Sequence, residues 1–158
     1  GYEFLAYAKA GRVKELWDFM YRVFGDWMDQ GHTRFPENFQ TEASRAKQLE
    51  FYRRPYGLSL CHGANGVPAV VGALNGLIGF SQSAEKPNEY TIKPELLHLK
   101  WITSRIPVKE GFISVKLNAT GESTIEIPNG CIVKVITKGE GKPLTLRKPG
   151  TYKFKLID

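Results

Sequence analysis

The spacing of the apolar residues changes partway along the chain, and this change is the strongest constraint on the fold. Up to about residue 80 apolar residues recur every three or four positions, which is typical of amphipathic helices. From Tyr90 onward they alternate with polar residues, which is typical of strands with one buried face. The sequence therefore predicts a helical part over residues 1–80 and a β-rich part over 90–158. The polar stretch 81–89, SQSAEKPNE, is predicted to be the linker between them.

Three helices are predicted in the first part. A short helix spans Tyr2–Lys9, and Gly11 separates it from a longer one over Arg12–Gln30. A third strong helix spans about Ala64–Ile78 and ends at Gly79, a residue type that is common just after a helix. The first two form an αα-hairpin, which cannot bury its apolar stripe alone.

Five or more short strands are predicted in the second part. Glycine-containing turn signals separate the alternating runs at intervals of about ten residues, as in antiparallel sandwiches. The alternation places Val115, Val133 and Phe154 inside, and Lys153 and Lys155 outside. A register slip of one residue would invert every face, so these positions test the assignment. The predicted fold class is α+β, with helices followed by a small antiparallel β-sandwich.

Charge and composition argue against several classes of partner and cofactor. The net charge is +6, but many of the basic residues are spread singly along the predicted strands, unlike the basic patch of a nucleic-acid binder. No run of about 18 apolar residues occurs, so we expect no membrane partner. Cys61 and Cys131 lie far apart, and the three histidines match no metal motif. We therefore expect buried free thiols, no metal and no cofactor; nothing indicates the compartment.

Glu37 is the strongest candidate for chemistry. It stands between Phe35 and Phe39, in a segment that Pro36 makes irregular, between two amphipathic helices. Apolar surroundings raise the pKa of a carboxyl group, and glycosidases use such groups as acids or bases. An exposed loop glutamate fits the same pattern, so composition alone is compatible with both interpretations.

His62 lies just before the third predicted helix, beside Cys61. A cysteine and a histidine can form a thiol nucleophile, but adjacent side chains rarely point at one another. A helix-entry histidine that is bonded to the backbone is the other interpretation. Tyr56 belongs to a short aromatic and basic cluster, residues 52–56, which either binds hydroxyl groups or forms a solvated loop.

Two short motifs and the order of the predicted elements resemble a known family. The motifs are GHTRFPENF at residues 31–39 and YGLSLCHG at residues 56–63. An apolar helix that ends at Ile78-Gly79 follows them, and then a β-rich tail with Trp101 and the turn Pro128-Asn129-Gly130. This order resembles the C-terminal third of glycoside hydrolase family 78, the α-L-rhamnosidases.

The resemblance implies that residues 1–80 are the last helices of an (α/α)6 barrel. It also implies hydrolysis with inversion by two glutamates. Glu37 matches the general base of the family, and His62 matches a residue that lines the sugar subsite. We expect Phe35 and Tyr56, which belong to the same two motifs, to contact the substrate. The general acid would lie upstream.

We expect the chain to be part of a larger enzyme, because it opens within a helical pattern without an initiator methionine. A barrel of twelve helices needs on the order of 300 residues, so this chain alone should be inactive. The expected partners are a rhamnoside or related glycoside and the rest of the same protein, with self-association of the exposed helices. Two alternatives are another (α/α)6 carbohydrate-active enzyme and a non-catalytic carbohydrate-binding or structural module. An exposed aromatic platform on the sheet would favour the binding module.

Overall fold

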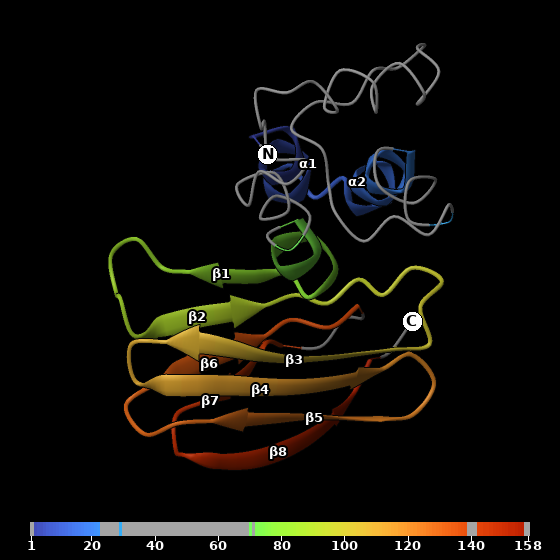
Figure 1. Ribbon diagram of the computed structural model, residues 1–158. Coiled ribbons are helices and arrows are strands. Elements are labelled where there is room, and N and C mark those ends of the chain that lie inside the picture. Colours follow the sequence, from blue (N-terminus) through green and yellow to red (C-terminus); the bar gives the residue numbers. More distant parts are fainter. Residues whose placement is uncertain (1, 23–28, 30–69, 71, 139–141, 157–158) are drawn as a thin grey trace, which may run out of the picture. The chain divides into compact units, whose positions relative to one another are not determined.

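The computed structural model describes residues 2–22, 29, 70, 72–138 and 142–156. The chain divides into two compact units, Gly1–Gly72 and Ala73–Asp158. Helices α1 and α2 belong to the first unit, and all the labelled strands belong to the second (Figure 1). Within the described ranges no helix has the length and apolarity needed to cross a membrane.

The first unit begins with the predicted helical hairpin. Helix α1 spans Tyr2–Lys9 and α2 spans Val13–Met20, and Gly11 lies between them at a φ of +69°. A positive φ suits glycine, because it has no Cβ to clash with the backbone. The separation of the helices at Gly11 is therefore confirmed, whereas the predicted extension of the second helix to Gln30 runs into residues outside the described ranges.

Aromatic packing joins α1 to α2. Phe4 and Leu16 are buried, and the ring centroids of Phe4 and Phe19 lie 5.0 Å apart. Such tilted ring pairs add stability beyond the area that they bury. The described helices of this unit form a hairpin and do not display the (α/α)6 barrel that the resemblance implies, so the barrel stays a prediction.

The end of the third predicted helix belongs to the second unit. Ala73–Leu77 forms η2, a π-helical turn, rather than the α-helix that the spacing predicts. Leu77 and Ile78 are buried, as the apolar stripe requires. Gly79 follows at a φ of +66°, and a side chain there would overlap with the backbone carbonyl of Lys93. The predicted glycine stop is confirmed.

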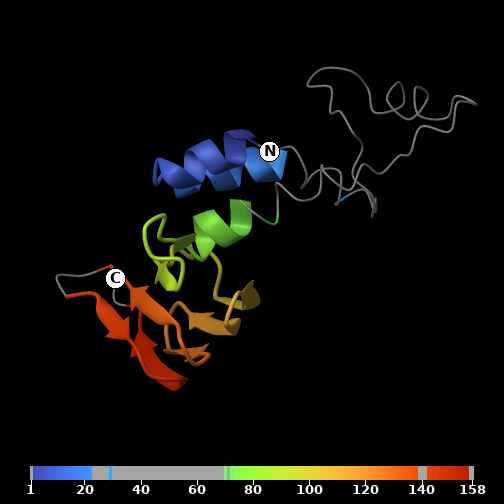
Figure 2. The same cartoon turned by 90° about the vertical axis from the view of Figure 1, so that its left-hand side faces the viewer.

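Eight strands are described in the second unit. They are β1 (Phe80–Gln82), β2 (Glu89–Ile92), β3 (Trp101–Val108), β4 (Gly111–Asn118), β5 (Glu122–Ile127), β6 (Ile132–Val135), β7 (Leu144–Leu146) and β8 (Gly150–Lys155). They form two four-stranded sheets, in the orders β1-β2-β6-β7 and β3-β4-β5-β8 (Figures 1 and 2). The predicted change from helices to a small two-sheet sandwich is confirmed.

Residues 81–89 belong to the β-hairpin that β1 and β2 form, so their assignment to a linker is wrong. Strand β1 pairs with β2 in the antiparallel sense, with Phe80 opposite Ile92. The connecting turn is ordered by the hydroxyl of Ser83, which accepts a hydrogen bond of 3.2 Å from the amide of Lys86. The segment is polar because two of the three residues of β1 are exposed. Composition alone could not distinguish such a strand from a linker.

The sandwich is also not wholly antiparallel. Strands β2 and β6 pair in the parallel sense, with Tyr90 opposite Val133, whereas the other described pairs are antiparallel. A parallel pair needs a crossover connection, and here the chain builds β3, β4 and β5 in the other sheet before it returns as β6. Alternation of apolar and polar residues is the same in both pairings, so it could not reveal the direction.

The core lies between the two sheets, and both contribute to it. The buried apolar residues are Ile78, Tyr90, Ile92, Leu96, Ile106, Ile113, Val115, Leu117, Ile125, Ile127, Cys131, Val133, Val135 and Leu146. Phe154 is partly buried and packs against this cluster, whereas Lys153 and Lys155 are exposed. The predicted inside and outside positions are therefore confirmed.

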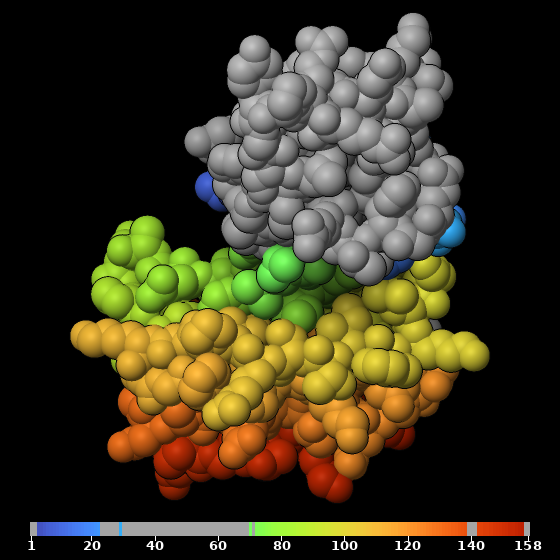
Figure 3. Space-filling model, viewed as in Figure 1, coloured from blue at the N-terminus to red at the C-terminus, as the bar shows by residue number. Residues whose placement is uncertain are grey.

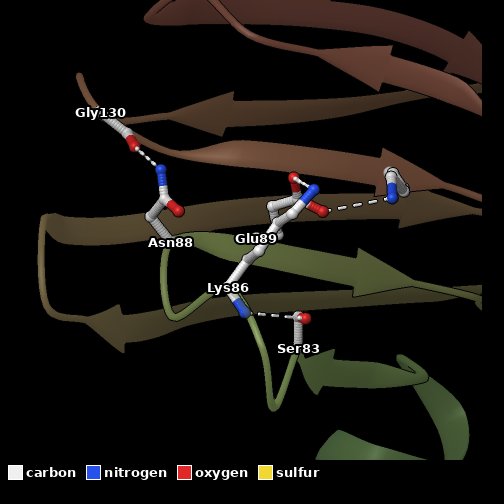
Figure 4. A network of polar contacts seen from close by, with 6 residues as sticks. Ser83, Lys86, Asn88, Glu89 and Gly130 are labelled. Atoms are coloured by element: carbon white, nitrogen blue, oxygen red, sulfur yellow. Dashed lines mark hydrogen bonds and ion pairs between the residues drawn. The ribbon is translucent and has the colours of Figure 1, made fainter.

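Polar contacts fasten the β1–β2 hairpin to strand β6 (Figure 4). The carboxylate of Glu89 lies 3.3 Å from the ammonium groups of both Lys86 and Lys134. The amide of Asn88 donates a 3.1 Å hydrogen bond to the carbonyl of Gly130, just before β6. The hydrogen bond from Lys134 is the main reason why the pKa of Glu89 is lowered, although burial opposes it. These contacts hold the parallel pair in place.

Candidate functional site

The four residues that the sequence assigns to a glycosidase site lie outside the described residues. Glu37, Phe35, Tyr56 and His62 all fall within residues 30–69. Their roles as general base and as substrate-binding residues therefore stay predictions.

The outer face of the β3-β4-β5-β8 sheet carries polar residues that the strand register brings into rows. One row contains Arg105, Ser114, Glu126 and Thr151, one residue from each strand in that order. The next row contains Thr103, Lys116, Thr124 and Lys153. Between these rows Val115 on β4 and Ile125 on β5 are buried in the core, and side chains along a strand alternate between its two faces, so the residues of the rows face outward.

These rows line a hollow of about 420 Å³. The hollow exists because the short side chain of Ser114 stands between the long side chains of Arg105 and Glu126. Neighbouring strands are about 4.8 Å apart, so the backbones that carry the two long side chains are separated by about 9.6 Å. The other lining residues are Thr103, Ser104, Val115, Lys116, Thr124 and Thr151. Figure 3 shows the surface over β3, β4 and β5 in yellow to orange.

The charged groups of the hollow are not neutralised by one another. In the described part of the chain none of the side chains of Arg105, Lys116 and Glu126 takes part in a hydrogen bond or an ion pair. Lys153, by contrast, lies 2.8 Å from the carboxylate of Glu122. This hydrogen bond raises the pKa of Lys153. The hollow thus presents two cations and one anion that are available to a ligand.

Two aromatic residues are exposed on the same face. Trp101, at the start of β3, is 68% exposed, and Phe112, near the start of β4, is 45% exposed. The guanidinium of Arg105 lies 3.9 Å from the centroid of the Phe112 ring. A cation–π contact of this kind holds the guanidinium plane in one orientation without using its N–H donors.

A second polar cluster is partly buried in the second unit. The hydroxyl of Tyr90 donates a 2.8 Å hydrogen bond to the carboxylate of Glu110, and the Sγ atom of Cys131 lies 3.5 Å from the same oxygen. Burial is the main cause that raises the pKa of Tyr90 to about 12 and that of Cys131 to about 11. The hydrogen bond from Tyr90 lowers the pKa of Glu110.

This cluster is suited to a structural role. A cysteine acts as a nucleophile through its thiolate, and a thiol with a pKa of about 11 stays protonated at neutral pH. Cys131 is a buried free thiol, as the sequence predicts, whereas Cys61 lies outside the described residues. In the described ranges no three His, Cys, Asp or Glu residues come together in a way that could hold a metal ion.

The hollow does not have the groups that inverting hydrolysis needs. That reaction needs two carboxyl groups on opposite sides of the bond, one as acid and one as base. Among the residues that line the hollow, all of them in the described sheet, only Glu126 has a carboxylate. The alternation in the sequence places these polar residues outside but gives no sign of a binding surface. The available signal was the presence of Ser and Thr close to charged residues on three neighbouring strands. It could not be used, because the register that brings these residues together across four strands cannot be obtained from alternation alone.

Comparisons with solved structures show a likeness in fold. No protein-family model and no curated protein sequence matches the chain. Among solved structures, the chain is similar to part of the native α-L-rhamnosidase from Aspergillus terreus, with a TM-score of 0.51 and 20% sequence identity. The match covers 64% of this chain and 12% of that one. The predicted likeness to a portion of an α-L-rhamnosidase is therefore confirmed for the fold.

Proposed function

We propose that this chain is part of an inverting glycoside hydrolase of the α-L-rhamnosidase type, and that it supplies the general base, Glu37. The observation that carries the proposal is the shared fold with a portion of an α-L-rhamnosidase. The motif around Glu37 supports it independently, because this motif resembles the base motif of glycoside hydrolase family 78.

In the proposed mechanism Glu37 removes a proton from a water molecule as that water attacks the anomeric carbon. A second carboxylic acid, from the rest of the protein, protonates the leaving oxygen on the other side of the bond. The two carboxyl groups of an inverting enzyme lie about 6.5–9.5 Å apart, which leaves room for the water. His62, Phe35 and Tyr56 bind the sugar. In this proposal the helical part completes an (α/α)6 barrel, and the sandwich is an accessory domain.

The test is turnover of an aryl α-L-rhamnoside by the full-length protein and its variants. Glu37→Gln should lower kcat at least about 10²-fold, because the change keeps the shape of the side chain but removes the base. His62→Ala should mainly raise KM and reduce kcat less than Glu37→Gln does. Glu42→Gln, which alters a nearby glutamate outside both motifs, is the matched control and should keep normal turnover.

Thermal melts of all variants check that each one is folded. Near-normal turnover in a folded Glu37→Gln enzyme would show that Glu37 is not the base. An equal loss of turnover in Glu42→Gln would show that any change in this segment lowers activity, so the loss in Glu37→Gln could not be assigned to its carboxylate.

A further inference from the structure

We infer that the hollow on the β3-β4-β5-β8 sheet binds an acidic oligosaccharide, one whose sugar rings carry carboxylates as uronic acids do. This inference does not rest on the role of Glu37, because the hollow is formed wholly by strands of the second unit. It gives the sandwich a binding activity of its own.

Charge complementarity identifies an anionic ligand. The hollow contains the guanidinium of Arg105 and the ammonium of Lys116 against the single carboxylate of Glu126. Within the described residues neither cation has an ion-pair partner. A sugar carboxylate would supply that partner, and a guanidinium binds a carboxylate through two parallel hydrogen bonds. Phe112 already holds the guanidinium in place, so little side-chain entropy would be lost on binding.

The neutral lining residues identify a sugar rather than an inorganic anion. Ser114 and the three threonines of the hollow offer hydroxyl groups, which both donate and accept hydrogen bonds. Glu126 can accept hydrogen bonds from two sugar hydroxyls. A ligand that satisfies this lining needs several hydroxyls together with a negative charge, as an acidic sugar has.

The exposed aromatic residues indicate that the ligand is longer than one sugar. Trp101 lies on the same strand and the same face as Arg105, four residues away, which corresponds to about 13 Å along β3. An oligosaccharide that is anchored at Arg105 can therefore extend along the strand and stack a ring on the indole. Trp101 and Phe112 are the exposed aromatic feature that favours carbohydrate binding by the sheet.

Other polyanions fit this face less well. A nucleic-acid backbone carries one phosphate per nucleotide and needs an unbroken basic surface. Here Glu122 and Glu126 on β5 interrupt the basic residues of the neighbouring strands. An apolar peptide would leave the charged groups of the hollow desolvated and unpaired, which is costly. The acidic oligosaccharide is the ligand that uses both the charges and the hydroxyls.

The experiment titrates the 158-residue chain with tri-galacturonic acid, and with neutral galactotriose as the matched ligand. Calorimetry gives the affinity, and amide chemical shifts locate the bound ligand. We expect the acidic ligand to bind with shift changes centred on β3, β4 and β5, and the affinity to fall as salt is added. Arg105→Gln and Lys116→Gln should each raise Kd about tenfold or more, because each removes a charge-assisted hydrogen bond. Lys93→Gln, an exposed lysine away from the hollow, is the control and should leave Kd unchanged.

Four results would overturn the inference. They are an absence of binding at millimolar ligand, equal binding of the neutral sugar, unchanged affinity in both hollow variants, and equally tight binding of a single-stranded DNA of the same charge. The substitutions are on an exposed surface, where changes in stability are usually small, so melting temperatures near that of the unaltered chain confirm folding.

Discussion

Replacing Gly79 by alanine should destabilise the second unit strongly. Gly79 lies two residues after the end of η2 at a φ of +66°, a conformation that costs a residue with a side chain about 1–2 kcal/mol. An added Cβ would also overlap with the carbonyl of Lys93, which belongs to the backbone and has no free rotation by which to move away. The backbone at Gly79 and Lys93 must therefore separate.

The size of the effect follows from what that separation breaks. The amide of Lys93 donates a 3.2 Å hydrogen bond to the carbonyl of Gly79, and the loss of such a bond costs about 1 kcal/mol. Together with the backbone cost we expect a loss of about 2–3 kcal/mol in the free energy of unfolding. For a domain of this size that corresponds to a melting temperature lower by roughly 8–24 °C.

Differential scanning calorimetry measures the change, with Gly130→Ala as the matched control. Gly130 lies in the same unit at a φ of +87°, but its added Cβ would lie 3.5 Å from the Cγ atom of Glu110, an ordinary contact. In Gly130→Ala the free energy of unfolding should fall only by about 1–2 kcal/mol, the cost of the positive φ. Equal losses in the two variants would refute the role assigned to the Lys93 carbonyl.

Two further predictions concern the buried tyrosine and the isolated chain. The pKa of Tyr90 is raised to about 12 from an ordinary 10, so its contribution to stability is fully present below pH 10 and is lost as the pH rises through 12. Urea unfolding between pH 10 and pH 12 should show a smaller loss of stability in Tyr90→Phe than in the unaltered chain. An identical pH dependence in the two proteins would contradict the raised pKa of Tyr90. The 158-residue chain alone should hydrolyse no aryl rhamnoside, because a base without a general acid loses about 10²–10⁴-fold in rate. Measurable turnover by the pure chain would contradict the proposed division of the two carboxylates.

Local patterns were enough to predict where two helical segments end and which faces of two strands are buried. The glycine positions gave the ends of the helices, because Gly11 and Gly79 both have a positive φ. Alternation gave the buried face of β4 and β6, since side chains along a strand point to opposite sides. These features depend on residues that are close in the sequence.

The features that the sequence did not reveal depend on residues that are far apart in it. The parallel pairing of β2 with β6 is set by the path of the chain through the other sheet. The hollow needs Arg105, Ser114 and Glu126 in one row, and three different strands supply them. The β1–β2 hairpin was mistaken for a linker because its exposed edge strand is as polar as a linker. The assignment of Glu37 rests on a motif resemblance and still requires a chemical test.

The most direct test of Glu37 as a general base is chemical rescue of a Glu37→Gly variant of the full-length enzyme. Azide is already an anion and needs no base, so it can attack from the space that the carboxylate leaves. We predict that azide restores the cleavage of an activated aryl α-L-rhamnoside, and that proton NMR shows β-L-rhamnosyl azide, the inverted product. Formation of the α-linked rhamnosyl azide would contradict the assignment of Glu37 as the general base. So would a folded Glu37→Gly variant that is inactive in water and that azide does not rescue.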